Sequence, residues 1–250
     1  MVTKILFSSE EIENQFHSVI KNGVLFMPSI SCGNVDQMAL DLVIFSGIQL
    51  NRIQRVGSIY CSNLQAIVGV SAFGDDVNEN TCPTTGIELY MMKDAPNAFL
   101  QVRSQPKDGY AEQFVEDLLS LLQSWQVNSI VVFSAADSTF YDSSQMNGTL
   151  AYYTTSNSVL DKIQDQVPSI NITQEDVNGS GLLPLLQKSL IEASIPFTTF
   201  IAFITEGQNF GDAIQYLSRV NSVIDILCGM DVRIPSSWAM VDPLLSEENE

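Results

Sequence analysis

The chain has 250 residues, of which 45% are hydrophobic and 16% charged, which indicates a globular protein with a hydrophobic core rather than a disordered chain. Lys and Arg number 11 against 29 Asp and Glu, giving a formal net charge of −18. A field of that sign repels nucleic acid phosphates and anionic membrane surfaces, so we expect no nucleic acid and no membrane partner. The same charge suits solubility, and it equally suits a basic protein partner.

Residues 1–22 are polar and show no clear hydrophobic period, so we interpret them as a polar leader that is either loose or a short helix. They contain His17, the only histidine. The four cysteines are far apart in the sequence, at Cys32, Cys61, Cys82 and Cys228. Without a C-x-x-C pair or an apolar secretory segment, free thiols in a reducing compartment are expected, with no metal site and no cofactor.

The first strand, turn and helix are clearly marked. Residues 24–27 are an apolar run before a proline, typical of a buried strand. Beyond Gly33, apolar residues recur from Val35 onward with the spacing of one helix face. Asn34 is a good N-cap and Gln37 stands at position N3, so the pattern predicts a capping box at the start of this helix.

The middle of the chain alternates strand-like and helical patterns. Strands with turn residues between them are expected at residues 53–60, 66–70, 87–91 and 98–102. Residues 110–125 predict a helix with one apolar face, and the apolar run at 130–133 is typical of a central parallel strand. Residues 137–179 are rich in Ser, Thr, Asn, Asp and Gln, so an irregular insertion is expected there.

Two further helices and a strand are expected in the last third. A glycine turn at 179–181 leads into a helix that ends near residue 193, with Pro184 in its first turn. Residues 197–204 predict another buried strand, and residues 210–227 predict the last long helix.

The entry to that last helix resembles the entry to the first one. Glu206 and Gly207 form a turn, and Asn209 is the expected N-cap. Asp212 stands at N3, where its charge complements the positive end of the helix dipole.

Strand–helix units therefore alternate over residues 23–238, which predicts a single three-layer α/β/α domain with a mixed, largely parallel sheet. Pro235 and Trp238 lie in a short segment at its end, and residues 239–250 are an acidic C-terminal tail.

Catalytic motifs are missing from the sequence. There is no G-x-S-x-G elbow to use His17, no Walker A loop and no G-x-G-x-x-G fingerprint. The turns at Asn34 and Glu206 both follow predicted buried strands, where open α/β sheets place ligand sites. They could hold a small-molecule pocket of a hydrolase or transferase, but helix capping explains both turns as well.

Two helices carry a second apolar stripe beside the main one. In the first helix these additional residues are Leu40 and Ile44, and in the last they are Tyr216, Val223 and Ile226. A helix that is apolar on more than one face is either deeply buried or shared with a partner. The sequence leaves both possibilities open, so these five residues are candidate partner contacts.

Three stretches resemble the proteasome assembly chaperone 2 family. They are residues 25–44 with a Gly-Asn-Val turn, residues 203–213 with the pattern Glu-Gly-x-Asn-x-x-Asp-Ala, and the Ile-Pro-Ser-Ser-Trp run at 234–238. The matching motif residues are Gly33, Asn34, Val35, Glu206, Gly207, Asn209, Asp212, Pro235 and Trp238.

This resemblance implies a phosphorylase-like, Rossmann-like α/β fold without enzymatic activity. It further implies a heterodimer with proteasome assembly chaperone 1 that binds α-subunits of the 20S proteasome, promotes α-ring formation and prevents off-pathway ring association. The expected location is the cytoplasm, with the nucleus as a second one.

The end of the chain departs from what the resemblance implies. Chaperones of this type carry a C-terminal hydrophobic–Tyr–any-residue tail that inserts between α-subunits, whereas this sequence has no tyrosine near its end. Its last residues include Glu247, Glu248 and Glu250. We therefore expect an acidic tail that pairs with lysines of the α-ring.

Overall fold

The computed structural model describes residues 3–73, 83–141, 150–155 and 177–239. Eight strands form one sheet in the order β1-β3-β6-β7-β2-β8-β10-β9. Their bounds are β1 Thr3–Phe7, β2 Val24–Pro28, β3 Ile53–Cys61, β6 Ile87–Met92, β7 Asn97–Val102, β8 Ser129–Asp137, β9 Leu150–Thr154 and β10 Phe197–Ile204. A separate two-stranded ribbon pairs β4 Val68–Gly69 with β5 Thr84–Thr85.

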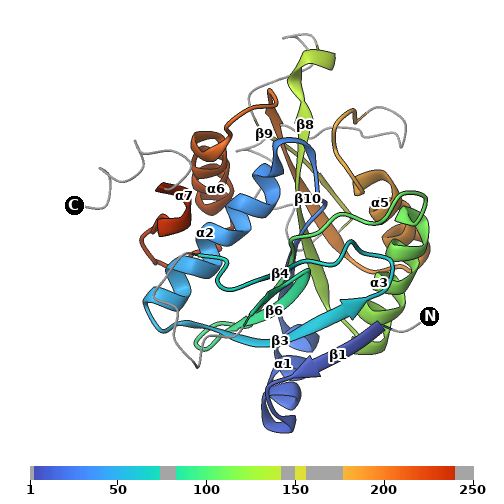
Figure 1. Ribbon diagram of the computed structural model, residues 1–250, viewed down its shortest axis with the longest axis vertical. Coiled ribbons are helices and arrows are strands. Elements are labelled where there is room, and N and C mark those ends of the chain that lie inside the picture. Colours follow the sequence, from blue (N-terminus) through green and yellow to red (C-terminus); the bar gives the residue numbers. More distant parts are fainter. Residues whose placement is uncertain (1–2, 74–82, 142–149, 156–176, 240–250) are drawn as a thin grey trace.

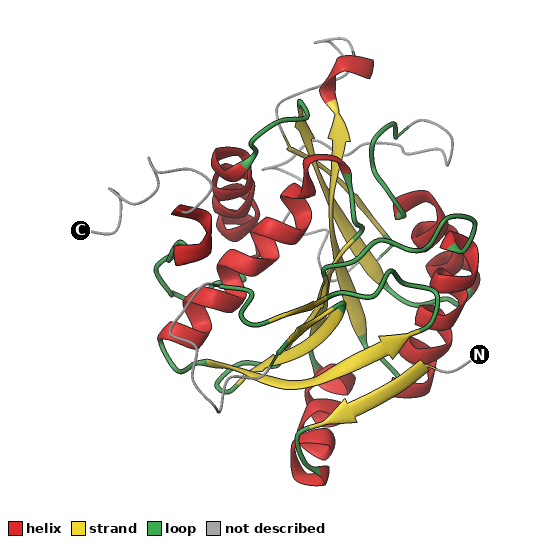
Figure 2. Ribbon diagram, in the orientation of Figure 1, coloured by secondary structure: helices red, strands yellow, loops and turns green. Residues whose placement is uncertain are grey.

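Helices cover both faces of the sheet, as Figures 1 and 2 show. On one face lie α2 Val35–Gln49, α6 Phe210–Ile224 and the short α7 Ser236–Ala239. On the other lie α1 Glu10–Asn22, α3 Ala111–Trp125 and α5 Leu183–Glu192. Each face has its own cluster of buried apolar side chains, so the predicted three-layer α/β/α architecture is confirmed.

The sheet is mixed, as the sequence predicts. The parallel pairs β7–β2, β2–β8 and β8–β10 form its centre, while antiparallel pairs add β6, β3 and β1 at one end and β9 at the other. All eight residues of β10 are buried, because helices cover it on both sides. The carboxyl ends of β2, β8 and β10 consequently lie at the same edge of the sheet.

The first residues form a strand and a helix that belong to the sheet and its cover, so the helical one of the two expected forms is present, but not as a leader outside the domain. β1 pairs with β3, and α1 begins after Ser9, whose side chain caps the backbone N–H of Ile12. Phe16 and Ile20, one turn apart on α1, are fully buried. His17 lies beside the rings of Phe16 and Trp125 rather than in open solvent. The apolar face of α1 is short and lies among acidic residues, so the sequence shows no clear period here.

Two other segments differ from the expectations. Within residues 66–70 only Val68–Gly69 is a strand. The expected irregular insertion at 137–179 contains the edge strand β9, which pairs antiparallel with β10, and residues 142–149 and 156–176 lie outside the described residues. The helix expected at 210–227 ends earlier, where Asp225 takes a left-handed backbone conformation.

Candidate functional site

The turns at Gly33–Asn34 and Glu206–Gly207 meet at the carboxyl edge of the sheet, as the sequence suggests. Gly33 has φ +63°, and a Cβ there would lie 1.9 Å from Nδ2 of Asn209. A glycine therefore suits this position, since any larger residue would be strained at this φ and would displace the side chain of Asn209. Glu206 and Gly207 themselves are exposed.

The expected helix caps do not form. Asn34 has a left-handed backbone, φ 54°, and its side chain makes no capping hydrogen bond, because an N-cap requires an extended backbone to reach the first turn. Gln37 donates instead to the carbonyl of Val102 in β7. Asn209 makes no cap either, and its Nδ2 is buried with no partner among the described residues. Asp212 is exposed in the first turn of α6.

Asp36, for which the sequence predicts no role, ties the loop after β2 to the start of α2. Its carboxylate is fully buried and accepts backbone N–H bonds from Ser29 at 2.9 Å, Ser31 at 3.0 Å and Gln37 at 2.9 Å. Burial raises the pKa of this carboxyl. Since its oxygens hold the loop after β2 to the first turn of α2, Asp36 has a positioning role. An acidic residue inside an apolar helical pattern was the available signal.

A line of buried hydroxyls continues from this loop across the sheet. Oγ of Ser29 lies 2.8 Å from Oγ of Ser134 in β8. The hydroxyl of Tyr216 in α6 accepts from the backbone N–H of Ser134 and donates to the carbonyl of Phe200. These groups satisfy one another, and His17 lies on the opposite face, so the cluster holds elements together and lacks the base of a serine hydrolase.

Cys32 brings a thiol to this edge, in the loop after β2. Burial, followed by the negative charges of Asp137, Asp36 and Glu206, raises the pKa of its thiol to about 11. The thiol therefore stays protonated at neutral pH and is a weak nucleophile. Within the described part of the chain, His, Cys, Asp and Glu side chains form no group of three or more that could hold a metal.

A hollow of about 360 Å³ opens beside Asn34. It is lined by Asn34, Gln37, Met38, Asp41, Gln65, Ile67, Arg103 and Gln105. The lining includes Asn34 but not Glu206. The two turns thus meet as expected, yet they do not share this hollow.

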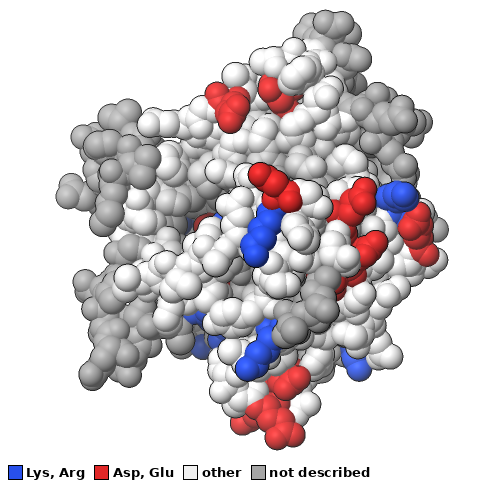
Figure 3. All heavy atoms as spheres, turned by 45° about the vertical axis from the view of Figure 1, so that its right-hand side comes forward, with Lys and Arg blue, Asp and Glu red and all other residues white. Residues whose placement is uncertain are grey.

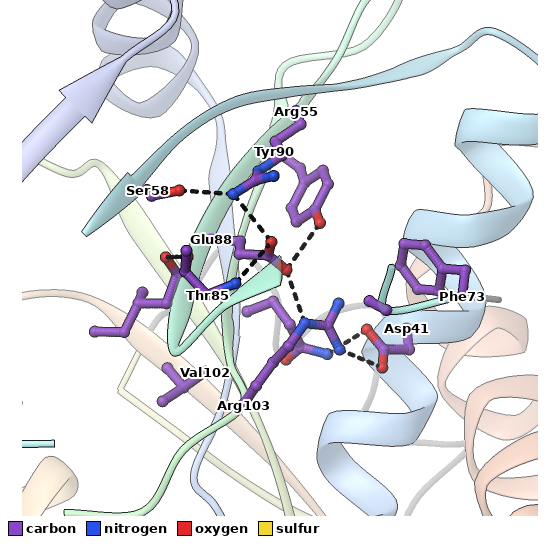
Figure 4. Close-up of polar contacts among 12 residues, drawn as sticks. Asp41, Arg55, Ser58, Phe73, Thr85, Glu88, Tyr90, Val102 and Arg103 are labelled. Atoms are coloured by element: carbon purple, nitrogen blue, oxygen red, sulfur yellow. Dashed lines mark hydrogen bonds and ion pairs between the residues drawn. The ribbon is translucent and has the colours of Figure 1, made fainter. Parts of the chain in front are cut away.

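Beneath the hollow lies a buried ionic cluster, drawn in Figure 4. The Glu88 side chain, 2% exposed, sits between two arginines: its Oε2 is 2.7 Å from Nε of Arg103 and its Oε1 is 3.1 Å from Nη2 of Arg55. Oδ2 of Asp41 in α2 lies 2.7 Å from Nη1 of Arg103. The Tyr90 hydroxyl donates to Glu88 over 3.1 Å, and burial raises the pKa of that phenol. Two charges of each sign balance here, which burial requires.

The second apolar stripes of the two helices are buried within the chain. Leu40, Ile44 and Ile226 are fully buried, and Tyr216 and Val223 are 3% and 9% exposed. α2 packs directly against α6, as Figure 1 shows. Burial within this chain therefore accounts for these residues without a partner.

The segment 234–238, which precedes the acidic tail, also packs on the α2–α6 face. Trp238 packs against Phe210 with 4.9 Å between the tilted rings' centroids, and Pro235 is buried. The backbone N–H of Ser237 donates to the carbonyl of Phe73. The acidic tail residues Glu247, Glu248 and Glu250 lie outside the described residues.

Exposed apolar side chains gather instead at the β1–β3 end of the molecule. Leu6, Tyr60, Ile67 and Val68 are 45%, 46%, 40% and 77% exposed. Figure 3 shows one face on which acidic and basic side chains form separate small groups with uncharged surface between them. None of the helices in the described residues is long and apolar enough to cross a membrane.

Comparison with known proteins identifies the family. The sequence profile of the PAC2 family matches residues 25–236. Proteasome assembly chaperone 2 of Mus musculus is 24% identical, covering 89% of this chain and 92% of its own length, and that of Homo sapiens is 25% identical, covering 87% and 90%.

Among solved structures, Pyrococcus furiosus PbaA, described as an archaeal homolog of proteasome-assembly chaperone, shares the fold. Its TM-score is 0.61 at 11% identity, covering 99% of this chain and 92% of that one. The family profile spans both the carboxyl-edge turns and the Pro235 segment. The chain belongs to the PAC2 family.

Proposed function

We propose that the protein is an assembly chaperone of the 20S proteasome that acts by binding other proteins and not by catalysis. The observation that carries this proposal is the family match over residues 25–236, together with relatives named proteasome assembly chaperone 2 that align over most of the chain. The carboxyl edge of the sheet supports the non-catalytic part. Its hydroxyls, the Asp36 carboxylate and the Cys32 thiol are engaged in hydrogen bonds or protonated.

In this proposal the chain pairs with proteasome assembly chaperone 1, and the heterodimer binds 20S α-subunits, promotes α-ring formation and prevents off-pathway ring association. It acts in the cytoplasm and also in the nucleus. The exposed apolar surface near Tyr60 and Val68 supports a protein contact, because monomers rarely expose such groups together. The net charge of −18 favours approach to basic protein surfaces.

Co-expression with chaperone 1 and the α-subunits tests this function. We expect a stable complex of the two chaperones, and more complete α-rings by native mass spectrometry than in cells that lack this chain. A normal yield of α-rings in its absence, with no complex formed, would contradict the proposal.

The acidic tail contributes to ring binding in the same proposal. Glu247, Glu248 and Glu250 pair with lysines of the α-ring, so deleting residues 246–250 weakens binding, and the loss is larger at low salt. Titrations at two ionic strengths measure it. Unchanged affinity at low salt would exclude this role.

A hydrolase or transferase with a pocket near Asn34 and Glu206 is the alternative. The hollow beside Asn34 favours it, but Glu206 does not line that hollow. A metabolite bound to the purified protein, and turnover lost on Glu206→Gln, would replace the chaperone proposal by this one.

A further inference from the structure

A second hollow, the apolar hollow, lies between the end of β3 and the β4–β5 ribbon. Its volume is about 370 Å³. Its lining is Ile59, Tyr60, Cys61, Ser62, Leu64, Gln65, Ala66, Ile67, Val68, Thr85, Gly86 and Lys107. It adjoins the hollow beside Asn34, because Gln65 and Ile67 line both.

The rim of the apolar hollow exposes large apolar side chains. Val68 is 77% exposed, Tyr60 46% and Ile67 40%. Leu6 of β1 extends the same surface: in the antiparallel register Leu6 stands opposite Ser58 and Lys4 opposite Tyr60, so Leu6 and Tyr60 point to the same face. Because large exposed apolar patches mark protein contacts, this surface is a candidate contact.

The chain does not cover this patch with its own helices. Tyr60 lies on the face of the sheet that carries α2 and α6. In the register of β3 and β6, Ser58 stands opposite Glu88, and Glu88 points to the same side as Tyr90, which belongs to the apolar cluster of that face. Tyr60 is two residues from Ser58 and therefore points to this side as well. α2 and α6 pack over the sheet centre, while β1 and β3 lie at its far end (Figure 1). In the described residues the cover there is the β4–β5 ribbon and the segment that leads into it.

The charge of the patch differs from that of the chain. Lys107 is the one charged residue in the lining, and Lys4, opposite Tyr60, is exposed. Asp108 follows Lys107 and is exposed, and the Asp117 carboxylate lies 3.9 Å from Sγ of Cys61 and accepts from Asn63, but neither acid lines the hollow. A complementary surface therefore has an apolar centre and a carboxylate at its rim. A second copy is a poor occupant, since it would bring together two chains of net charge −18.

We propose that the apolar hollow is the docking site for a partner protein that inserts an apolar side chain and sets an acidic group against Lys107. This deepens the proposed function and rests on it for the identity of the partner, which is the partner chaperone. The many apolar and few charged groups of the patch suit a lasting subunit contact.

Matched substitutions test the docking site, with purified proteasome assembly chaperone 1 as the probe. Val68→Asp places a charge in the centre of the contact and weakens binding at least about tenfold. Val232→Asp, the same change at another exposed valine, leaves affinity unchanged. Lys107→Glu weakens binding by a smaller factor that grows at low salt. Equal affinity of Val68→Asp and wild type would overturn the docking site.

Alkylation of Cys61, a lining residue, gives an independent readout. Docking slows its reaction with iodoacetamide, and Cys61→Ser identifies the signal. Cys32 contributes little, because its thiol has a pKa of about 11. An unchanged Cys61 rate in the complex would also overturn the proposal.

The same variants separate failure of this site from failure of the proposed function. Wild type could bind α-subunits but not chaperone 1. If Val68→Asp then abolishes the binding to α-subunits, the docking site is correct and the pairing with chaperone 1 is wrong. If wild type binds neither protein, both fail. If wild type self-associates and Val68→Asp makes it monomeric in sedimentation, a second copy replaces the partner and the proposal is wrong.

Discussion

The two halves of the sheet face that carries α2 are covered in different ways. Over the sheet centre, α2 and α6 seal the face with apolar side chains such as Leu40 and Ile44, which are fully buried. Toward β3 and β6 the same face is occupied by the ionic cluster around Glu88 and by short ribbons, and Val68 is left in solvent. The first half is complete within one chain, whereas the second presents apolar surface outward. The contrast locates partner contact at the half that the chain leaves open.

Arg103→Met has the largest expected effect on stability. It leaves Glu88 and Asp41 buried with fewer partners, which costs about 3–5 kcal/mol of the free energy of unfolding. Chemical denaturation measures this loss. Arg52→Met is the control: Arg52 pairs with the half-exposed Asp94, so its loss is much smaller. Equal losses would show that the ion pairs of Glu88 are not shielded from solvent as its 2% exposure indicates.

Leu40→Ala tests the sealed half. A cavity at a fully buried leucine lowers the free energy of unfolding by about 2–5 kcal/mol. Ile191→Ala, at a side chain that is 47% exposed, is the matched control and changes little. Leu40→Ala could instead leave the free energy of unfolding unchanged and weaken partner binding. α2 would then be an interface helix, and partner contact would lie at the half covered by α2 and α6.

Asp36→Asn probes the tether between β2 and α2, with an expected loss of about 1–3 kcal/mol. Burial raises the pKa of Asp36 above its ordinary 3.8, so the unfolded chain loses the proton first as pH rises. The stability owed to Asp36 is then full below pH 3.8 and falls as pH rises through the raised pKa. Unfolding curves of both proteins across this range measure it. An advantage of wild type that grows with pH would contradict the raised pKa.

Val68→Asp has the smallest expected effect on the free chain. At 77% exposure the substitution changes the free energy of unfolding by no more than about 0.5 kcal/mol. Thermal unfolding of the isolated protein checks this. A large loss would mean that Val68 supports the fold of the free chain. The apolar surface of the second half would then not be reserved for a partner.

Local patterns in the sequence predict most of the fold. Apolar runs at β8 and β10, and the helical spacing from Val35, mark the centre of the sheet and its cover. Burial in β10 is visible in the sequence because every residue of the run has to be compatible with the core. The meeting of the Gly33 and Glu206 turns follows from the order of parallel strands.

Interactions between distant segments are not visible in this way. Asn34 looks like a helix cap, but the left-handed backbone that brings Gly33 against Asn209 prevents it. α1 appears polar because Phe16 and Ile20 stand alone among charged residues, and only their contact with the sheet reveals them. The pairing of Glu88 with Arg103 joins two strands and could be read only from the fold.

The loop that precedes α5 has a consequence for how this chain can vary. The backbone N–H of Cys32 donates to the carbonyl of Gly179, that of Asp137 to Asn178, and that of Leu182 to Ser29. A Cβ on Gly181 would lie 1.9 Å from the carbonyl oxygen of Ile30. The residues that flank 142–176 on both sides are thereby held to the sheet by hydrogen bonds that do not involve the segment itself. Insertions or deletions between those anchors that keep β9 paired with β10 carry only a slowly growing closure entropy, so relatives can differ in length here without a change in the pairing of β8 with β10.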